Sequence, residues 1–202
     1  MKKFISIILA VLLLAGCSNS SELAKLTDFT LNNVSYNLPT ELSNFLDNGW
    51  EQYSVHDVYI DLEQLILEPE SYINLMFMNS AVSQGTIIQL NIANMSKSSL
   101  MVKDCMVVTI MISRDTSDDI TYDENFFVMG NGLTFLSDIK EIKTSTSQYG
   151  KIEEYDSEFL VKENDTMLFY IFWIPSKDGE YLTDIYLNYG WDIDLFINYG
   201  DQ

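Results

Sequence analysis

Along much of the chain, apolar and polar positions alternate with a period of two. In residues 86–93, apolar side chains at 88, 90 and 92 alternate with Gln89 and Asn91. This alternation is typical of an antiparallel strand with one face in solvent. With Ser, Gly and Asn between the segments, it predicts strands over residues 72–78, 86–93 and 104–112. Earlier in the chain, Asn32-Asn33 predicts a tight turn between two short strand pieces.

A spacing of three to four residues indicates two short helices. The first is predicted after residue 39, with Thr40 as its cap and Gly49 as its left-handed stop. The second begins near residue 137, turns Ile139 and Ile142 inward and ends before Gly150. Further strands are predicted over residues 155–161, 167–174, 181–189 and 192–198. The similar order in both halves predicts an α+β fold of two similar units, each a short helix packed on an antiparallel β-sheet.

The N-terminus has the three parts of an export signal. A cationic start, Met1-Lys2-Lys3, precedes an apolar run from Phe4 to Leu14 and then a polar stretch. The run is about 11 residues long, which suits a cleaved signal and is too short for a bilayer core that needs roughly 20. The segment is therefore predicted to be removed on export.

Leu14-Ala15-Gly16-Cys17 resembles the lipobox of bacterial lipoprotein precursors. The resemblance implies cleavage after Gly16 and a diacylglycerol on the thiol of Cys17. The lipid would hold the exported protein on the outer face of the cytoplasmic membrane, or on the outer membrane if the host has one. The alternative is an ordinary secretory signal with an incidental cysteine.

These patterns divide the chain into four parts. We predict a signal peptide at 1–16, a lipidated tether at 17–28, a first helix-plus-sheet unit at 29–128 and a second at 129–202.

Two local resemblances concern the exported part. Gly132-Leu133-Thr134, a short helix and Gln148-Tyr149-Gly150-Lys151 resemble the small outer-membrane-assembly lipoproteins and the β-lactamase inhibitor proteins. That resemblance implies a helical segment against a curved antiparallel sheet, although Lys151 stands where those proteins often carry Pro. The pieces Tyr36-Asn-Leu-Pro39 and Asp47-Asn-Gly-Trp50 resemble uncharacterised lipoproteins of low-GC bacteria. Neither resemblance carries a functional residue.

The chain is strongly acidic, with a formal net charge of −19. Removal of residues 1–16 takes away two lysines and no acid, which brings the charge to −21. Nucleic acid and anionic lipid headgroups both require neutralising Lys or Arg, so neither is a predicted partner. The charge suits solubility outside a cell or a cationic partner, and the two interpretations stay open.

Candidate catalytic and thiol chemistry is sparse. The single histidine, His56, lies in Ser54-Val-His-Asp57, and no Gly-x-Ser-x-Gly elbow presents a nucleophile. One histidine and one remaining cysteine cannot complete a zinc shell. That cysteine, Cys105, lies in an apolar stretch and is predicted to be a buried, unreactive thiol. We predict no enzymatic activity, the alternative being a hydrolase that uses carboxylates or His56.

Calcium is the metal that the composition fits best, because it takes only oxygen ligands. Five carboxylates fall close together: Asp115, Asp118, Asp119, Asp123 and Glu124. They lack the spacing and central Gly of an EF-hand. A solvated acidic loop is the favoured interpretation and a weak calcium site the alternative. Apart from the covalent lipid, no cofactor is predicted.

Aromatic side chains concentrate near the C-terminus. The segment 167–174 is apolar on both faces, so both faces require a cover, which is either the other unit or a partner. In 181–189, the apolar residues take both parities, which predicts that one large apolar group sees solvent. A partner-binding surface is predicted from Tyr170, Phe172, Tyr186, Tyr189 and Trp191, ordinary sheet packing being the alternative.

The sequence therefore predicts a membrane-anchored accessory that binds a protein or another envelope component through an aromatic sheet face. A hydrolase and a calcium-stabilised surface module are the other two hypotheses.

Overall fold

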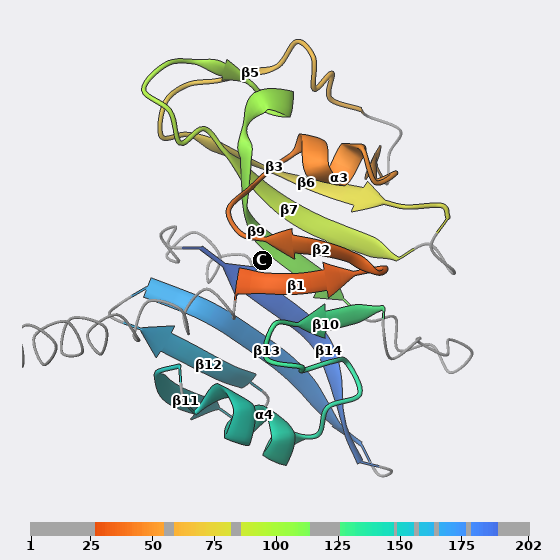
Figure 1. The fold of residues 1–202 in the computed structure, drawn as a ribbon, viewed down its shortest axis with the longest axis vertical. Coiled ribbons are helices and arrows are strands. Elements are labelled where there is room, and N and C mark those ends of the chain that lie inside the picture. Colours follow the sequence, from red (N-terminus) through yellow and green to blue (C-terminus); the bar gives the residue numbers. More distant parts are fainter. Residues whose placement is uncertain are drawn as a thin grey trace, which may run out of the picture.

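The computed structural model describes residues 27–54, 59–81, 86–113, 126–147, 149–155, 158–163, 166–176 and 179–189. Most of these residues belong to antiparallel strands, with two α-helices, α3 (Ser43–Leu46) and α4 (Ile139–Thr146). One large, curled sheet runs through the molecule, with strands of the first half at the top of Figure 1 and strands of the second half at the bottom.

The large sheet has nine described strands in the order β11-β12-β13-β14-β9-β7-β6-β4, with β3 beside β9. Strands from the first half of the chain are β3 (Thr40–Glu41), β4 (Glu51–Tyr53), β6 (Tyr72–Met78), β7 (Ile87–Ala93) and β9 (Met106–Ser113). Strands from the second half are β11 (Lys151–Tyr155), β12 (Glu158–Glu163), β13 (Thr166–Ser176) and β14 (Gly179–Asn188).

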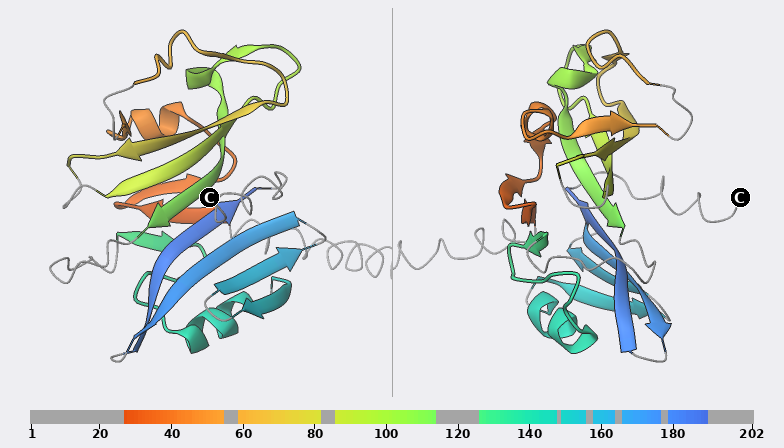
Figure 2. Two further views of the ribbon diagram at one scale, coloured as in Figure 1. Left: turned by 180° about the vertical axis from the view of Figure 1, so that it is seen from behind. Right: turned by 90° about the vertical axis from the view of Figure 1, so that its right-hand side faces the viewer.

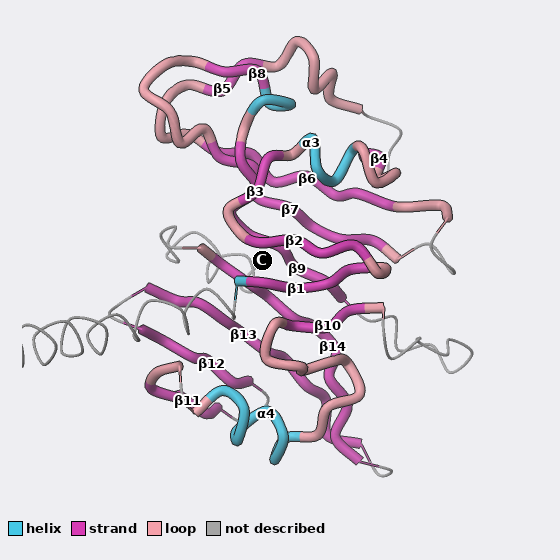
Figure 3. Tube along the Cα trace, viewed as in Figure 1, coloured by secondary structure: helices cyan, strands magenta, loops and turns pink. Residues whose placement is uncertain are grey.

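Two smaller sheets accompany it. One has the order β10-β1-β2 and consists of β1 (Asp28–Leu31), β2 (Val34–Asn37) and β10 (Phe127–Met129). The other is a ribbon of β5 (Ile66–Leu67) and β8 (Leu100–Met101), followed by a 3₁₀ turn, η1 (Val102–Asp104). Figure 3 shows the ribbon and this turn at the top of the molecule, beyond β6 and β7.

The predicted α+β fold of two helix-on-sheet units is wrong: the protein is mostly β, and both halves share one sheet. β14 pairs with β9, so that Ile185 lies opposite Ile112 and Leu187 opposite Ile110. Strand order along each half is a local property, but the last strand of each half leaves an edge of unpaired backbone groups. Pairing these two edges satisfies both, and the period-two pattern does not specify which edges meet.

Several predicted elements are confirmed. Strands β6, β7, β9, β13 and β14 overlap the predicted segments. Asn32 and Asn33 have φ of 50° and 63°, the two positive values of a tight hairpin turn, and they join β1 to β2. Gly49 has φ of 82° and follows α3 as predicted.

Two local predictions are wrong. Thr40 does not cap the first helix, because it lies in β3 opposite Val107 and the residue before the helix is Leu42. The predicted strand at 155–161 is divided between β11, which ends at Tyr155, and β12, which begins at Glu158. In the second case both strands of a hairpin contribute to one apparent periodic segment. The predicted strand at 192–198 lies outside the described residues.

Helix α4 begins with a capping box. The Asp138 carboxylate accepts from the Glu141 backbone N–H at 2.8 Å, and the Glu141 carboxylate accepts from the Asp138 N–H at 3.1 Å. Ile142 is buried and Ile139 packs against the core, as predicted. We expect Asp138→Ala to lower the free energy of unfolding by about 1 kcal/mol, because it removes the acceptor of that N–H. Urea denaturation beside the exposed Thr144→Ala control tests this, and equal losses in both variants would contradict it.

The core lies between the large sheet and a layer on one of its faces. In the right-hand view of Figure 2, α3, α4 and the β10-β1-β2 sheet all lie to the left of the large sheet. We call the covered side the inner face. Fully or nearly fully buried side chains on it are Phe77, Ile88, Leu90, Ile110, Ile112, Ile185 and Leu187. The opposite side is the outer face.

Candidate functional site

Polar side chains form a row across the outer face. The register places Asn74 of β6 opposite Asn91 of β7, Asn91 opposite Thr109 of β9, and Thr109 opposite Asn188 of β14. Four adjacent strands therefore each contribute one short polar residue to what we call the amide row. Asn91, Thr109 and Asn188 are all buried, with at most 4 % of each exposed.

The amide row is hydrogen-bonded along its length. Asn74 Nδ2 donates to Asn91 Oδ1 at 2.5 Å, and Gln89 Nε2 donates to Asn74 Oδ1 at 2.7 Å. At the other end, Thr109 Oγ1 donates to Asn188 Oδ1 at 3.0 Å. A buried amide costs free energy unless its polar atoms are paired, so these bonds allow the row to exist. They also fix the rotamers of the row.

Methionine and tyrosine side chains flank the amide row. On one side, Met76, Gln89, Met111 and Tyr186 lie in register across β6, β7, β9 and β14. Met76 is 40 % exposed, whereas Met111 is half-buried. On the other side of the row lie half-buried tyrosine and methionine residues of β6 and β9, Tyr72 and Met106. The outer face therefore presents thioethers and aromatic rings around a paired polar centre.

Tyr186, a predicted partner-binding residue, is buried with 5 % of its surface exposed. Its neighbours Ile185 and Leu187 are 1 % exposed, so the prediction that a large apolar group here sees solvent is wrong. Ile185 and Leu187 belong to the inner face, and Tyr186 takes the other parity beside Met111. Burial raises the pKa of Tyr186 well above its ordinary value, and a hydrogen bond with Thr109 acts in the opposite direction.

We expect this tyrosine to make the protein sensitive to alkali. Above a pH of about 10 the unfolded chain ionises the phenol while the folded protein keeps it neutral, so stability falls as pH rises. Tyr186→Phe removes this contribution and flattens the fall by up to about 1.4 kcal/mol per pH unit. Urea denaturation of both proteins between pH 8 and roughly 11.5 tests this. Parallel curves above pH 10 would show that burial of the phenol does not govern the loss.

The other predicted surface residues are only partly brought together. Tyr189 is 42 % exposed at the end of β14, where its backbone N–H donates to Val108 O at 2.9 Å. In backbone register, Tyr170 lies opposite Tyr186 and Phe172 opposite Asp184. Trp191 lies outside the described residues. The predicted surface built from these residues stays a prediction.

Several other predicted residues lie outside the described part of the chain: the lipidation site Cys17, His56, and the calcium candidates Asp115, Asp118, Asp119, Asp123 and Glu124. Within the described ranges, no three His, Cys, Asp or Glu residues are grouped to hold a metal ion. Cys105 is confirmed as a buried thiol, 1 % exposed, with its pKa raised first by burial and then by Asp104.

A surface hollow of about 510 Å³ lies beside the first turns of α4. Its lining includes Asn131, Ser137, Lys140 and Thr144. The nearby carboxylates of the capping box are already engaged by backbone N–H groups. The Thr144 hydroxyl likewise donates to Lys140 O at 2.7 Å. The hollow therefore offers fewer uncommitted polar groups than its lining suggests, and the outer face is the stronger candidate.

The amide row was not predicted as a site. Gln89 and Asn91 were assigned to a solvated face from their parity, and that parity is confirmed. The sequence gives no indication that Asn91, Thr109 and Asn188 meet, because the last two are separated by 79 positions. A polar residue at matching parity in each neighbouring strand is the only signal available, and it requires the strand order.

Comparison with known proteins identifies the N-terminus. Residues 1–18 match the model of the prokaryotic membrane lipoprotein lipid attachment site. The protein is accordingly an exported lipoprotein that a lipid anchors to a membrane, as the lipobox predicted. Among the residues that the structure describes, no helix is long and apolar enough to cross a bilayer.

Neither the curated proteins nor the solved structures gave a match to the chain. The local resemblances of the exported part to assembly lipoproteins, inhibitor proteins and low-GC lipoproteins therefore have no support from relatives.

Proposed function

We propose that this lipoprotein is a non-catalytic binding or assembly accessory, and that its outer face contacts a protein of the cell envelope. The observation that carries the proposal is the composition of this face. Partly exposed Met76, Tyr72 and Tyr53 surround a polar row that already satisfies its own hydrogen bonds. Such a face gains free energy by covering its apolar groups, without leaving a buried amide unpaired.

The chemistry of the outer face supports contact over catalysis. Acid–base catalysis needs a group whose pKa lies near the working pH. The described outer face consists mainly of amides, thioethers and tyrosines, and the buried phenol of Tyr186 is held in its neutral form. These groups position and cover a surface and do not transfer protons at neutral pH.

The partner is a polypeptide with a cationic surface. Methionine side chains are flexible and polarisable, and they adapt to irregular protein surfaces. The formal charge of −21 after loss of residues 1–16 attracts a basic partner and repels anionic lipid. The lipid anchor adds a high local concentration of the accessory at the membrane where such a partner lies.

Photo-crosslinking on intact cells tests the proposal. A photoreactive residue replaces Met76 on the outer face or, as the matched control, Leu136, which is 55 % exposed in the turn before α4 on the inner-face side. We expect a discrete protein adduct from position 76, none from position 136, and a weaker adduct at higher salt. No adduct from position 76, or the same adducts from both positions, would refute a specific outer-face contact.

A second variant separates binding from the hydrolase hypothesis. Met76→Glu adds a charge at a partly exposed position and should weaken the adduct formed from a photoreactive residue at position 72. His56→Ala should leave that adduct unchanged. Loss of the adduct with His56→Ala and not with Met76→Glu would argue against the outer face as the contact.

A further inference from the structure

The geometry points to a second contact surface on the β5–β8 ribbon, and we propose that it binds a polypeptide segment carrying apolar and cationic side chains. Ile66 and Met101 lie directly opposite each other in this ribbon, 58 % and 40 % exposed. Leu67 and Leu100 form the other cross-strand pair, and these pack toward the core. The ribbon therefore has one apolar pair inside and one apolar pair in solvent.

This exposure differs from that of a scattered surface residue. Single exposed apolar side chains are ordinary, but adjacent ones mark contact sites when they form a patch. Met95, 47 % exposed, precedes by a few residues the strand that carries Met101. Three of the large apolar side chains most exposed in the described ranges thus belong to this part of the first half.

A buried amide holds the ribbon in place. Asn94 is 0 % exposed, and its Nδ2 donates to Leu67 O and to Ser98 O, both at 2.8 Å. Its Oδ1 accepts from the backbone N–H and the hydroxyl of Ser96, at 2.9 and 2.8 Å. Both donors and both lone pairs of this side chain are used. The amide therefore connects β5 to the loop that leads into β8.

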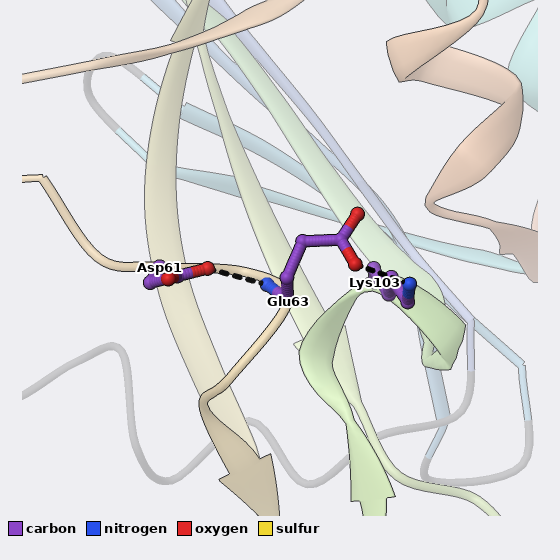
Figure 4. Close-up of polar contacts among 3 residues, drawn as sticks. All are labelled: Asp61, Glu63 and Lys103. Atoms are coloured by element: carbon purple, nitrogen blue, oxygen red, sulfur yellow. Dashed lines mark hydrogen bonds and ion pairs between the residues drawn. The ribbon is translucent and has the colours of Figure 1, made fainter.

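The segment before β5 is tied to the 3₁₀ turn after β8. The backbone N–H groups of Val102 and Lys103 donate to Leu65 O at 2.9 Å and to Leu62 O at 3.2 Å. Figure 4 shows the adjoining side chains, in which Lys103 pairs with Glu63 while the Glu63 N–H donates to Asp61 Oδ1 at 2.9 Å. A ribbon of two-residue strands is marginal by itself, so these contacts preorganise it.

The charges around the ribbon select the partner. The exposed carboxylates of the ribbon and its bracing loops are Asp61, Glu63, Glu68, Glu70 and Asp104. The cations of the same segments are Lys97 and Lys103, and Lys103 is already paired with Glu63. An excess of negative charge around an apolar pair favours a segment with leucine-like and lysine-like side chains. It disfavours an anionic membrane surface.

Titration of the lipid-free exported chain with a synthetic probe tests the proposal. The probe is a decapeptide that alternates Lys and Leu, and the control peptides alternate Lys with Ser and Glu with Leu. We expect amide NMR shifts to concentrate at 66–67 and 100–101, and the Lys–Leu peptide to bind at least about tenfold more tightly than either control.

Matched variants locate the site. Ile66→Ser combined with Met101→Ser should weaken Lys–Leu binding about tenfold without a change in Tm, because both side chains are exposed. Met76→Ser, on the outer face, should leave binding unchanged. Equal affinity in the double variant, equal affinity for the Lys–Ser peptide, or preferential binding to vesicles of anionic phosphatidylglycerol would overturn the proposal.

The same double variant distinguishes this surface from the proposed function. If the ribbon is a separate site, the adduct formed from position 76 persists in cells that carry Ile66→Ser and Met101→Ser. Loss of that adduct would show that the ribbon has no binding role of its own beyond the outer-face contact.

Discussion

Phe45→Ala is expected to lower the free energy of unfolding by about 3–5 kcal/mol, the loss typical of a large aromatic side chain removed from a core. Phe45 is the buried residue of α3, 0 % exposed. Its ring stacks on Tyr36 with centroids 4.4 Å apart, and Tyr36 stacks on Phe29 at 5.4 Å. Phe29 in turn contacts Phe127 of β10 at 5.8 Å. The substitution therefore opens a cavity at the end of an aromatic series that links both halves of the chain.

Urea denaturation monitored by the fluorescence of Trp50, which is 1 % exposed, measures this loss. Leu136→Ala is the control, since that side chain is 55 % exposed and its truncation should change stability by less than about 0.5 kcal/mol. A loss below about 1 kcal/mol for Phe45→Ala would mean that the ring is not part of the continuous core described here.

Leu187→Ala is expected to cost about 2–5 kcal/mol and, in addition, to loosen both halves together. Leu187 is 1 % exposed on β14 and lies opposite Ile110 of β9, at the junction where the two halves of the large sheet meet. Because that junction makes one sheet of nine strands, a defect there lowers the stability of strands on both sides.

Hydrogen exchange measured strand by strand tests this prediction. Amides of β7 and of β12 should lose protection by similar factors in Leu187→Ala, whereas Tyr189→Ala, at an exposed position beyond the junction, should leave both nearly unchanged. Loss of protection confined to β11–β13 would show that the halves unfold as separate units, contrary to the continuous sheet.

The two proposed surfaces differ in what their positions require. Outer-face residues come from four strands of the large sheet, so that face exists only when the halves are joined. The β5–β8 ribbon is held by contacts within residues 62–103 and depends on the first half alone. A variant weakened at the β14–β9 junction should therefore lose outer-face contacts before it loses binding at the ribbon.

The local chemistry of the chain was decided by the sequence itself. Residues 1–17 carry the anchor because charge, apolar length and the residues around the thiol are all adjacent along the chain. The Asn32-Asn33 turn, the stop at Gly49 and the strand at 72–78 were likewise predictable, since each depends on neighbours within a few positions. The burial of Cys105 followed from the apolar stretch around it.

Only the tertiary structure decided which strand edges meet, and that choice determined the fold and the candidate site. The amide row needs Thr109 and Asn188 side by side, although they are 79 positions apart, and no periodicity specifies that pairing. The same pairing turned Tyr186 from an expected surface residue into a buried one. Parity assigns a side chain to one of two faces, but the packing of distant strands and layers determines what covers each face.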